Sequence, residues 1–449
     1  MIVYSICYFA SFLLARAGWY LPSGLALLIA ALWLYWRDYQ ASGNLIHLRG
    51  LFCLGFVGGQ GLSCMKLSRL AEDWAWMTWL CFFSAVVCFY LAFSWAEKTR
   101  GSNMDAGAFA RKMGRGQAGV TVRFTNIGRE RARIMADSGG LFVAIMGICG
   151  VSLAAFLLEA AVLGYIPFFV RGVPHAYSYF HISGVHYFTV SCVLVPPLAV
   201  LYFLGRSGWK RWKEWAVIAA AAVALIIPVL CVSRFQLIFS VGLSVLVYIA
   251  VNRRFRLAYA AVLVAVMIPA YIILTIARSH DVSYLNGIFE MKNSAMPIFI
   301  TQPYMYVANN YDNFNCLVEQ LPAHTLGLRM LFPLWALTGM KFLYPNLVSF
   351  PIYITKEELT TVTLFYDAYY DFGIFGVMAL AAGLGWVCGY LVKRLKTMQN
   401  PAGYLLYAQM AMYMALSFFT TWFSNPTTWF YFAATGAVWF CTENVRWRR

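Results

Sequence analysis

Apolar segments of membrane-spanning length recur along this chain and are separated by shorter polar connections. A helix needs roughly 20 apolar residues to cross a bilayer, with a range of about 17–25. The pattern predicts twelve such helices: Ile2–Ala15, Tyr20–Trp36, Leu48–Met65, Met77–Ala96, Gly140–Gly164, Tyr187–Leu204, Trp215–Val232, Phe235–Val251, Leu257–Ala277, Phe372–Val392, Gly403–Phe423 and Thr427–Thr442. The first is the shortest, and we interpret it as a span rather than a cleavable signal peptide. The predicted fold is therefore an all-α polytopic membrane protein.

Positive charges divide the connections between these helices into two sides. One side holds 24 of the 34 Lys and Arg residues, in Arg37–Arg49, Glu97–Asp137, Gly205–Glu214, Asn252–Arg256, Lys393–Asn400 and the tail from Glu443. Because cytoplasmic connections retain Lys and Arg, this side is predicted to be cytoplasmic, with both termini inside. The formal net charge of +16 then reflects these connections, and we expect no nucleic-acid partner.

The same pattern divides the chain into five regions. They are four N-terminal spans (1–96), a basic cytoplasmic loop (97–139), five spans with an outer loop at 165–186 (140–277), a long outer loop (278–371), and three spans with a basic tail (372–449). Loops of such length are usually functional or disordered. The aromatic residues, prolines and apolar runs of the long loop predict an ordered, partly helical cap on the membrane.

Composition agrees with a membrane protein and excludes several other classes. The chain is 61% hydrophobic and 12% charged, about half the charged fraction of a soluble domain. Its eleven cysteines lie mainly within apolar runs and form no C-x-x-C pair, which argues against a disulfide framework. A phosphate-binding G-x-x-x-x-G-K-[ST] motif is also absent from the sequence.

Three arginines are predicted to meet at the outer face from separate parts of the chain. Arg234, in "LCVSRFQLIF", lies at a tight turn between two apolar runs, Arg278 ends the ninth span, and Arg171 lies in the first outer loop. An arginine fork matches the oxygens of phosphate or pyrophosphate. The alternative for each is an interfacial position or a structural ion pair.

Histidines also concentrate on the predicted outer side, at His175, His181, His186 and His280. Their spacing does not match H-E-x-x-H, which places two metal ligands on one helix face, and no metal site is predicted. With the neighbouring aromatic residues they could instead form a sugar-binding surface. His280 is a candidate general base, since imidazole titrates near neutrality; a surface or capping role is the alternative. Glu159, near the outer end of the fifth span, is expected to pair with an arginine or to take part in proton coupling.

The segment "TTVTLFYDAYYDFGIFG", Thr360–Gly376, places acids at the mouth of the tenth predicted span. Asp367 and Asp371 are four residues apart and therefore share a helix face, and Tyr366 and Tyr370 form a second such pair. These residues could bind sugar hydroxyls or supply a base. The alternative is an interfacial aromatic belt whose acids neutralise nearby arginines.

Together with "YIPFF", "SRFQLIFSVGLSVL" and "ARSHD", this segment resembles bacterial oligosaccharide repeat-unit polymerases, the O-antigen polymerase (Wzy) family. The most specific element is a threonine followed by a tyrosine and D-F-G-x-x-G, matched by Thr363, Tyr369 or Tyr370, Asp371, Phe372, Gly373 and Gly376. The resemblance covers roughly residues 140–391. It implies an architecture similar to C-type glycosyltransferases and O-antigen ligases.

The resemblance also implies a reaction. A growing glycan on undecaprenyl pyrophosphate is transferred to a lipid-linked repeat unit at the outer face of the bacterial cytoplasmic membrane, without cofactor or metal. A chain-length regulator and a flippase are the implied protein partners. The residues expected to serve it are His280, Asp371 and Arg278 in catalysis, Arg171, Arg234 and Arg278 at the pyrophosphate, and Asp367, Tyr366, Tyr370 and His181 at the sugar.

Three other functions share some of these features. An O-antigen ligase shares the donor and the arginines and differs in its acceptor. A lipid-linked oligosaccharide flippase or other secondary transporter needs a polar central cavity and has no need for a long outer cap. A lipid-phosphate-sugar transferase with an acidic metal site is disfavoured, because the first outer turn, "RAGW", contains no acid.

Overall fold

The computed structural model describes residues 1–98, 138–170, 176–205, 211–252, 282–395, 397–398 and 400–444. Within these ranges the regular elements are helices, and one isolated antiparallel bridge joins Ser68 to Met291. The α-helices are α1 (Ile2–Arg16), α2 (Tyr20–Ser42), α3 (Leu48–Phe52), α4 (Gly58–Cys64), α5 (Trp76–Lys98), α7 (Ser138–Leu163), α8 (Ala176–Tyr179), α9 (His186–Val190), α10 (Val195–Leu204), α11 (Arg211–Leu230), α12 (Arg234–Asn252), α14 (Val282–Phe289), α15 (Ile298–Gln320), α16 (Phe332–Leu337), α17 (Met340–Leu343), α18 (Tyr366–Leu395), α19 (Pro401–Ala415) and α20 (Pro426–Asn444).

Six helical segments of the described chain are long and apolar enough to cross a membrane: Trp76–Lys98, Gly139–Leu163, His186–Leu204, Arg211–Leu230, Arg234–Asn252 and Tyr366–Leu395. They support an α-helical membrane protein. Five further predicted spans coincide with α1, α2, the α3–α4 segment, α19 and α20, which are not among these six. The predicted span Leu257–Ala277 lies outside the described residues, so the number of twelve stays a prediction.

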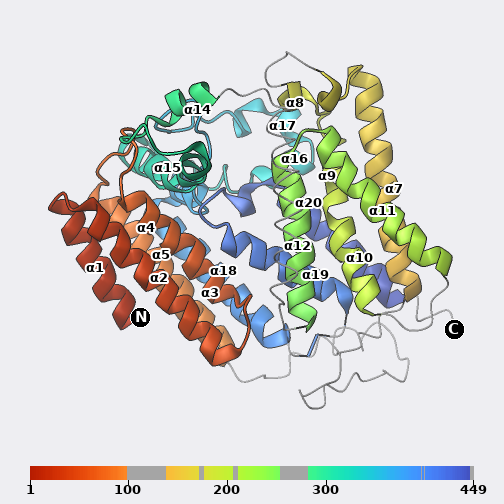
Figure 1. Ribbon diagram of the computed structural model, residues 1–449, viewed down its shortest axis with the longest axis horizontal. Helices are drawn as coiled ribbons and strands as arrows, with labels where there is room; N and C mark the ends of the chain where they lie inside the picture. Colours follow the sequence, from red (N-terminus) through yellow and green to blue (C-terminus); the bar gives the residue numbers. More distant parts are fainter. Residues whose placement is uncertain are drawn as a thin grey trace.

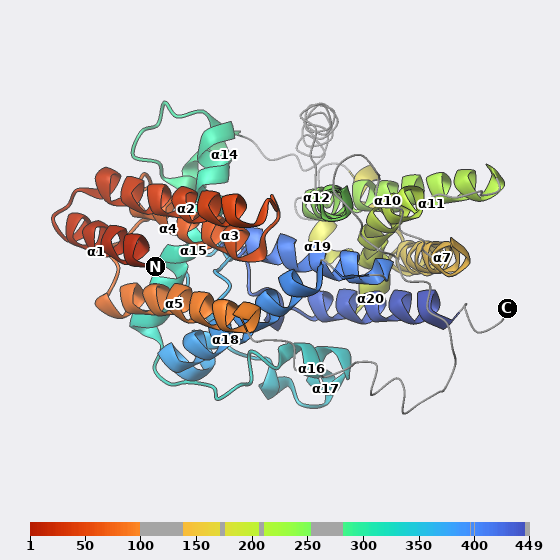
Figure 2. The ribbon, with the colours of Figure 1, turned by 90° about the horizontal axis from the view of Figure 1, so that it is seen from below.

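The helices form two groups that meet at α19 (Figure 1). One group contains α1 to α5 together with α18, which packs along α5 (Figure 2). The other contains α7, α9 to α12 and α20. Because α19 contacts both α3 and α12, it joins the two groups through their interiors.

Glycines let the third predicted span pack deep in the protein. A π-helical turn, Cys53–Val57, separates α3 from α4. A Cβ atom on Gly55 would lie 2.3 Å from the carbonyl oxygen of Ala415 in α19, and one on Gly59 would lie 2.6 Å from the hydroxyl of Tyr311 in α15. The glycine-rich sequence of this span therefore permits close backbone approach.

The long connection before α18 contains α14 to α17, which gather at one end of the molecule with α8 (Figure 1). Its longest helix, α15, packs against α4, α5 and α18. Five polar side chains of α15 are at most 4% exposed: Asn309, Asn310, Asp312, Asn313 and Asn315. Buried polar groups need partners, and these side chains bond to the N-terminal helices and to the segment that leads into α18.

Candidate functional site

Helix α18 contains Asp367 and Asp371 of the candidate site and is kinked at Gly373. Gly373 has φ 59° and ψ −146°, a conformation outside the helical region. A Cβ atom there would lie 3.0 Å from Nε2 of His324, and a Cβ atom on Gly376 would lie 2.1 Å from the carbonyl oxygen of Ala368. Both glycines of the sequence motif are thus required by the local backbone.

The carboxylate of Asp371 binds a turn of the preceding connection. It is fully buried and accepts hydrogen bonds from the Thr325 hydroxyl, from the Arg329 amide at 3.2 Å and from the Met330 amide at 2.8 Å. Both carboxylate oxygens are used. Asp371 therefore fixes the turn against α18, an arrangement that favours positioning over proton transfer to a substrate.

Asp367 pairs with an arginine that the sequence analysis did not select. Its Oδ1 lies 2.7 Å from Nε of Arg329, whose guanidinium stands 4.5 Å from the ring centre of Tyr370 and 5.7 Å from that of Tyr366. Burial lowers the pKa of Arg329, but the Asp367 carboxylate outweighs it and the pKa is raised overall. The two acids share a face as predicted, since both contact Arg329.

The hydroxyl of Tyr366 is already engaged by the backbone. It donates to the Tyr353 carbonyl at 2.9 Å and accepts from the Tyr353 amide at 2.8 Å. Arg329 could have been noticed as a charge within the apolar run "LGLRMLF", which is the kind of context that singled out Arg234. Its partners Tyr366, Asp367 and Tyr370, however, lie 37 residues or more along the chain.

The segment before α18 also meets α15 and the turn that follows α19. The Thr361 hydroxyl donates to Oδ1 of Asn310 at 2.6 Å, and the Leu364 amide donates to the Ser417 carbonyl at 3.0 Å. Nδ2 of Asn310 donates to the Phe418 carbonyl at 2.7 Å. Three separate parts of the chain thus converge on the predicted site.

Arg234 is the first residue of α12. It is 9% exposed. The ring of Phe235 stacks on Phe419 at 5.4 Å and on Trp422 at 5.9 Å. Arg234 is therefore next in the chain to a residue that packs on this turn, and the turn also contacts the segment leading into α18.

Glu159 is paired with a histidine rather than with an arginine. Its fully buried carboxylate lies 3.1 and 3.2 Å from Nδ1 of His186 and also accepts from the Ile182 amide at 2.9 Å and the Thr189 hydroxyl at 2.7 Å. His181 is exposed, and its ring centre lies 6.3 Å from that of His186. Glu159 of α7 and His186 of α9 thus form a carboxylate–imidazole pair that sequence spacing alone did not reveal.

The remaining predicted site residues, Arg171, Arg278 and His280, lie outside the described residues. Because Arg171 and Arg278 are among them, the convergence of three arginines stays a prediction. Among the residues that the structure describes, no three His, Cys, Asp or Glu side chains are grouped closely enough to hold a metal ion.

A buried ion pair ties α15 to the N-terminal helices. Nζ of Lys66 lies 2.7 Å from Oδ1 of Asp312, which also accepts from the Trp74 indole at 2.7 Å. Both charged side chains are about 95% buried. The pair lies beside a small recess that Arg16 and Asp73 also line.

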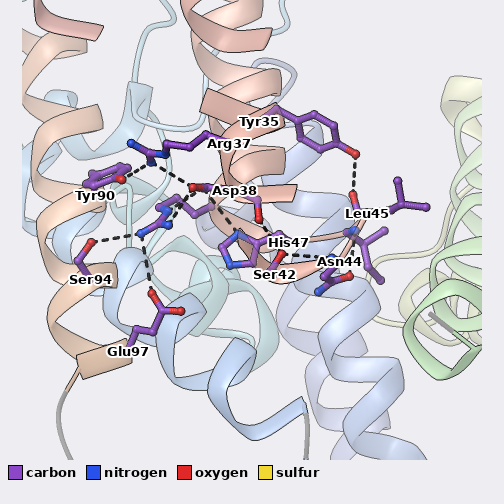
Figure 3. A network of polar contacts seen from close by, with 12 residues as sticks. Tyr35, Arg37, Asp38, Ser42, Asn44, Leu45, His47, Tyr90, Ser94 and Glu97 are labelled. Carbon is purple, nitrogen blue, oxygen red and sulfur yellow. Dashed lines mark hydrogen bonds and ion pairs between the residues drawn. The ribbon is translucent and has the colours of Figure 1, made fainter. Parts of the chain in front are cut away.

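A second charged network surrounds Asp38, near the C-terminal end of α2 (Figure 3). Arg49 donates to both oxygens of Asp38, at 2.7 and 2.9 Å, and Arg37 donates to one at 3.1 Å. His47, in the turn between α2 and α3, lies 3.7 Å from the same carboxylate. Burial lowers the pKa of His47 to about 4. Part of the predicted basic connection is therefore a structural network and not a solvated loop.

A comparison of this chain with protein-family models, with curated proteins and with solved structures finds no match.

Proposed function

We propose that this protein is a membrane glycosyltransferase that polymerises oligosaccharide repeat units linked to undecaprenyl pyrophosphate, at the outer face of the bacterial cytoplasmic membrane. The observation that supports the proposal is the buried Arg234, whose chain neighbour Phe235 packs on the turn that also bonds to the Thr360–Gly376 segment. A buried guanidinium at the end of a membrane helix is costly and is typical of a functional site. Its fork is suited to a pyrophosphate.

In the proposed reaction, the acceptor hydroxyl attacks the anomeric carbon of the donor glycan, and the bond from that carbon to the pyrophosphate oxygen breaks. Arg234, with Arg278 and Arg171 from the sequence, would stabilise the charge that develops on the leaving pyrophosphate. Direct displacement would invert the anomeric centre. The polyprenyl tail would remain in lipid between the helices.

The sugar would be bound beside Asp367 and Tyr370, with His181 contributing from the first outer loop; the Tyr366 hydroxyl is already bonded to the Tyr353 backbone, so Tyr366 would contribute only its ring. The contacts of Arg329 with Asp367 and with both tyrosine rings add a further donor to this set. Aromatic rings and hydrogen-bonding side chains placed together are the ordinary means of holding a polar ligand with apolar faces.

The contacts that hold the connection between α14 and α18 in place favour an enzyme over a flippase. The connection between α14 and α18 is held by the Lys66–Asp312 ion pair, by Asp371 and by Asn310. A transporter must move one part of its structure against another around its substrate. A fixed, multiply bonded cap is better suited to excluding water from a reacting centre.

The proposal is tested by reconstituting the full chain in liposomes that contain lipid-linked repeat units on the exposed face. A polymerase should produce a ladder of longer glycans without any transport, and EDTA should not change the yield. Arg234→Ala should remove the ladder while the protein remains folded. A ladder of wild-type intensity from that variant would refute the role of Arg234, and a failure of the wild-type protein to make a ladder from its cognate substrate would refute the enzyme.

A further inference from the structure

The Glu159–His186 pair has the geometry of a base held in one tautomer. A carboxylate that is ionised can only accept hydrogen bonds. The Glu159 oxygens accept from the Ile182 amide and the Thr189 hydroxyl, which favours the ionised form. The nitrogen that faces them, Nδ1 of His186, must then carry its hydrogen.

With Nδ1 as the donor, the lone pair of the neutral imidazole is on Nε2. The carboxylate is fully buried, whereas the His186 side chain is 31% exposed. The imidazole therefore lies between a buried negative charge and the surface. A carboxylate in this position fixes the ring orientation and stabilises the imidazolium that forms when Nε2 takes a proton.

This pair is close to the turn that precedes Arg234. Cys231 of that turn is near enough to Glu159 for the two groups to interact electrostatically. Phe168, from the first outer loop, packs against the buried cluster of Val232 and Leu237. The loop that carries His186 and the turn that carries Arg234 thus belong to one neighbourhood.

We propose that His186 is the general base of the transfer reaction, an inference that rests on the function proposed above. Nε2 of His186 takes the proton of the acceptor sugar hydroxyl as its oxygen forms a bond to the anomeric carbon. The electrons of the breaking carbon–oxygen bond leave with the pyrophosphate. The imidazolium then releases its proton to water or to the departing pyrophosphate, which restores the base.

Glu159 is a positioning residue in this scheme, because it acts through the imidazole. Asp371 is less suited to be the base, because donors occupy both of its oxygens and its side chain is fully buried. In His186, by contrast, Nδ1 donates to Glu159, and the lone pair of Nε2 can accept a proton.

The decisive variant is His186→Asn. An asparagine amide can replace Nδ1–H as the donor to Glu159 but has no basic nitrogen in place of Nε2. The turnover number in the ladder assay should fall by about 10²- to 10⁴-fold, with little change in KM for the acceptor and no change in thermal unfolding. The control is Tyr390→Phe, since Tyr390 is 42% exposed near the C-terminal end of α18, at the other end of that helix from Asp367 and Asp371.

A pH profile separates a base from a structural histidine. The titratable groups that face this region are Glu159 from α7, His181 from the preceding connection, Cys231 from the α11–α12 turn and Tyr431 from α20. Activity needs neutral His186, so it should fall on the acidic side. Glu159→Gln removes the carboxylate charge beside the imidazole and should displace this acidic limb.

The outcomes distinguish the two proposals. A wild-type ladder together with a His186→Asn variant that retains more than a third of the turnover would overturn the base and leave the polymerase intact. An acidic limb that does not move in Glu159→Gln would equally overturn it. No ladder from the wild-type protein would remove the polymerase and with it the reaction that this base serves.

Discussion

Replacing Asp371 with asparagine tests whether this carboxylate holds the cap or acts on the substrate. The carboxylate accepts from the Thr325 hydroxyl and from the amides of Arg329 and Met330. Asparagine keeps one acceptor oxygen and presents an N–H group where the other oxygen was. At least one of the two backbone amides then loses its partner.

The change in the free energy of local opening follows from these contacts. A hydrogen bond to a charged group contributes about 1.5–3 kcal/mol, and bonds to one acceptor are not additive. We therefore expect the turn around Arg329 to open more easily by about 2–4 kcal/mol. Since each 1.4 kcal/mol corresponds to a factor of ten, this predicts roughly 30- to 1,000-fold faster exchange.

The assay is hydrogen–deuterium exchange of the peptide that contains Thr325 to Met330, measured by mass spectrometry in detergent or nanodiscs. The matched control is Asp367→Asn, which removes the partner of the Arg329 side chain and leaves the backbone amides bonded to Asp371. Its exchange in this peptide should stay within about threefold of the wild type, because local opening reports the bonds of the amides themselves.

The reasoning would be refuted if Asp371→Asn left the exchange of this peptide unchanged and still abolished glycan transfer. That result would place Asp371 at the substrate. Faster exchange together with a loss of transfer would instead show that the cap has to be docked for the reaction.

Three further predictions follow from other contacts. Lys66→Met should destabilise the protein by about 3–5 kcal/mol by leaving a buried charge unpaired, and Lys66→Met with Asp312→Leu should recover most of that loss in detergent unfolding; equal losses would contradict the pairing. Because burial lowers the pKa of His47 from 6.5 to about 4, stability should fall by up to about 3 kcal/mol as the pH drops from 6.5 to 4. His47→Gln should flatten that dependence, and an unchanged slope would exclude His47 as its source. Arg234→Lys keeps the charge but loses the fork, and its transfer rate should fall at least about tenfold in the ladder assay; a wild-type rate would exclude a bidentate contact.

The hydrophobic pattern located most helices well because a membrane span has a fixed length and composition. The predicted spans Met77–Ala96 and Phe235–Val251 differ by only one or two residues at each end from α5 and α12. The pattern was less informative where polar residues are buried by protein contacts. The sequence of α15 is too polar for a span, and its central place in the fold depends on partners elsewhere in the chain.

The candidate site was predicted in part, for a similar reason. Spacing of four residues was enough to place Asp367 and Asp371 on one face, because that relation is local. The pairings with Arg329, and of Glu159 with His186, join residues 27 to 42 positions apart. Such pairings are set by how loops close on helices, which neither periodicity nor residue type determines.

The most direct test of the central claim is to count products from one reconstituted reaction. The protein, given only lipid-linked repeat units, should release one undecaprenyl pyrophosphate for each new glycosidic bond, and mass spectrometry should show products spaced by one repeat unit. Movement of the lipid-linked unit across the membrane with no new glycosidic bond and no released pyrophosphate would contradict the account.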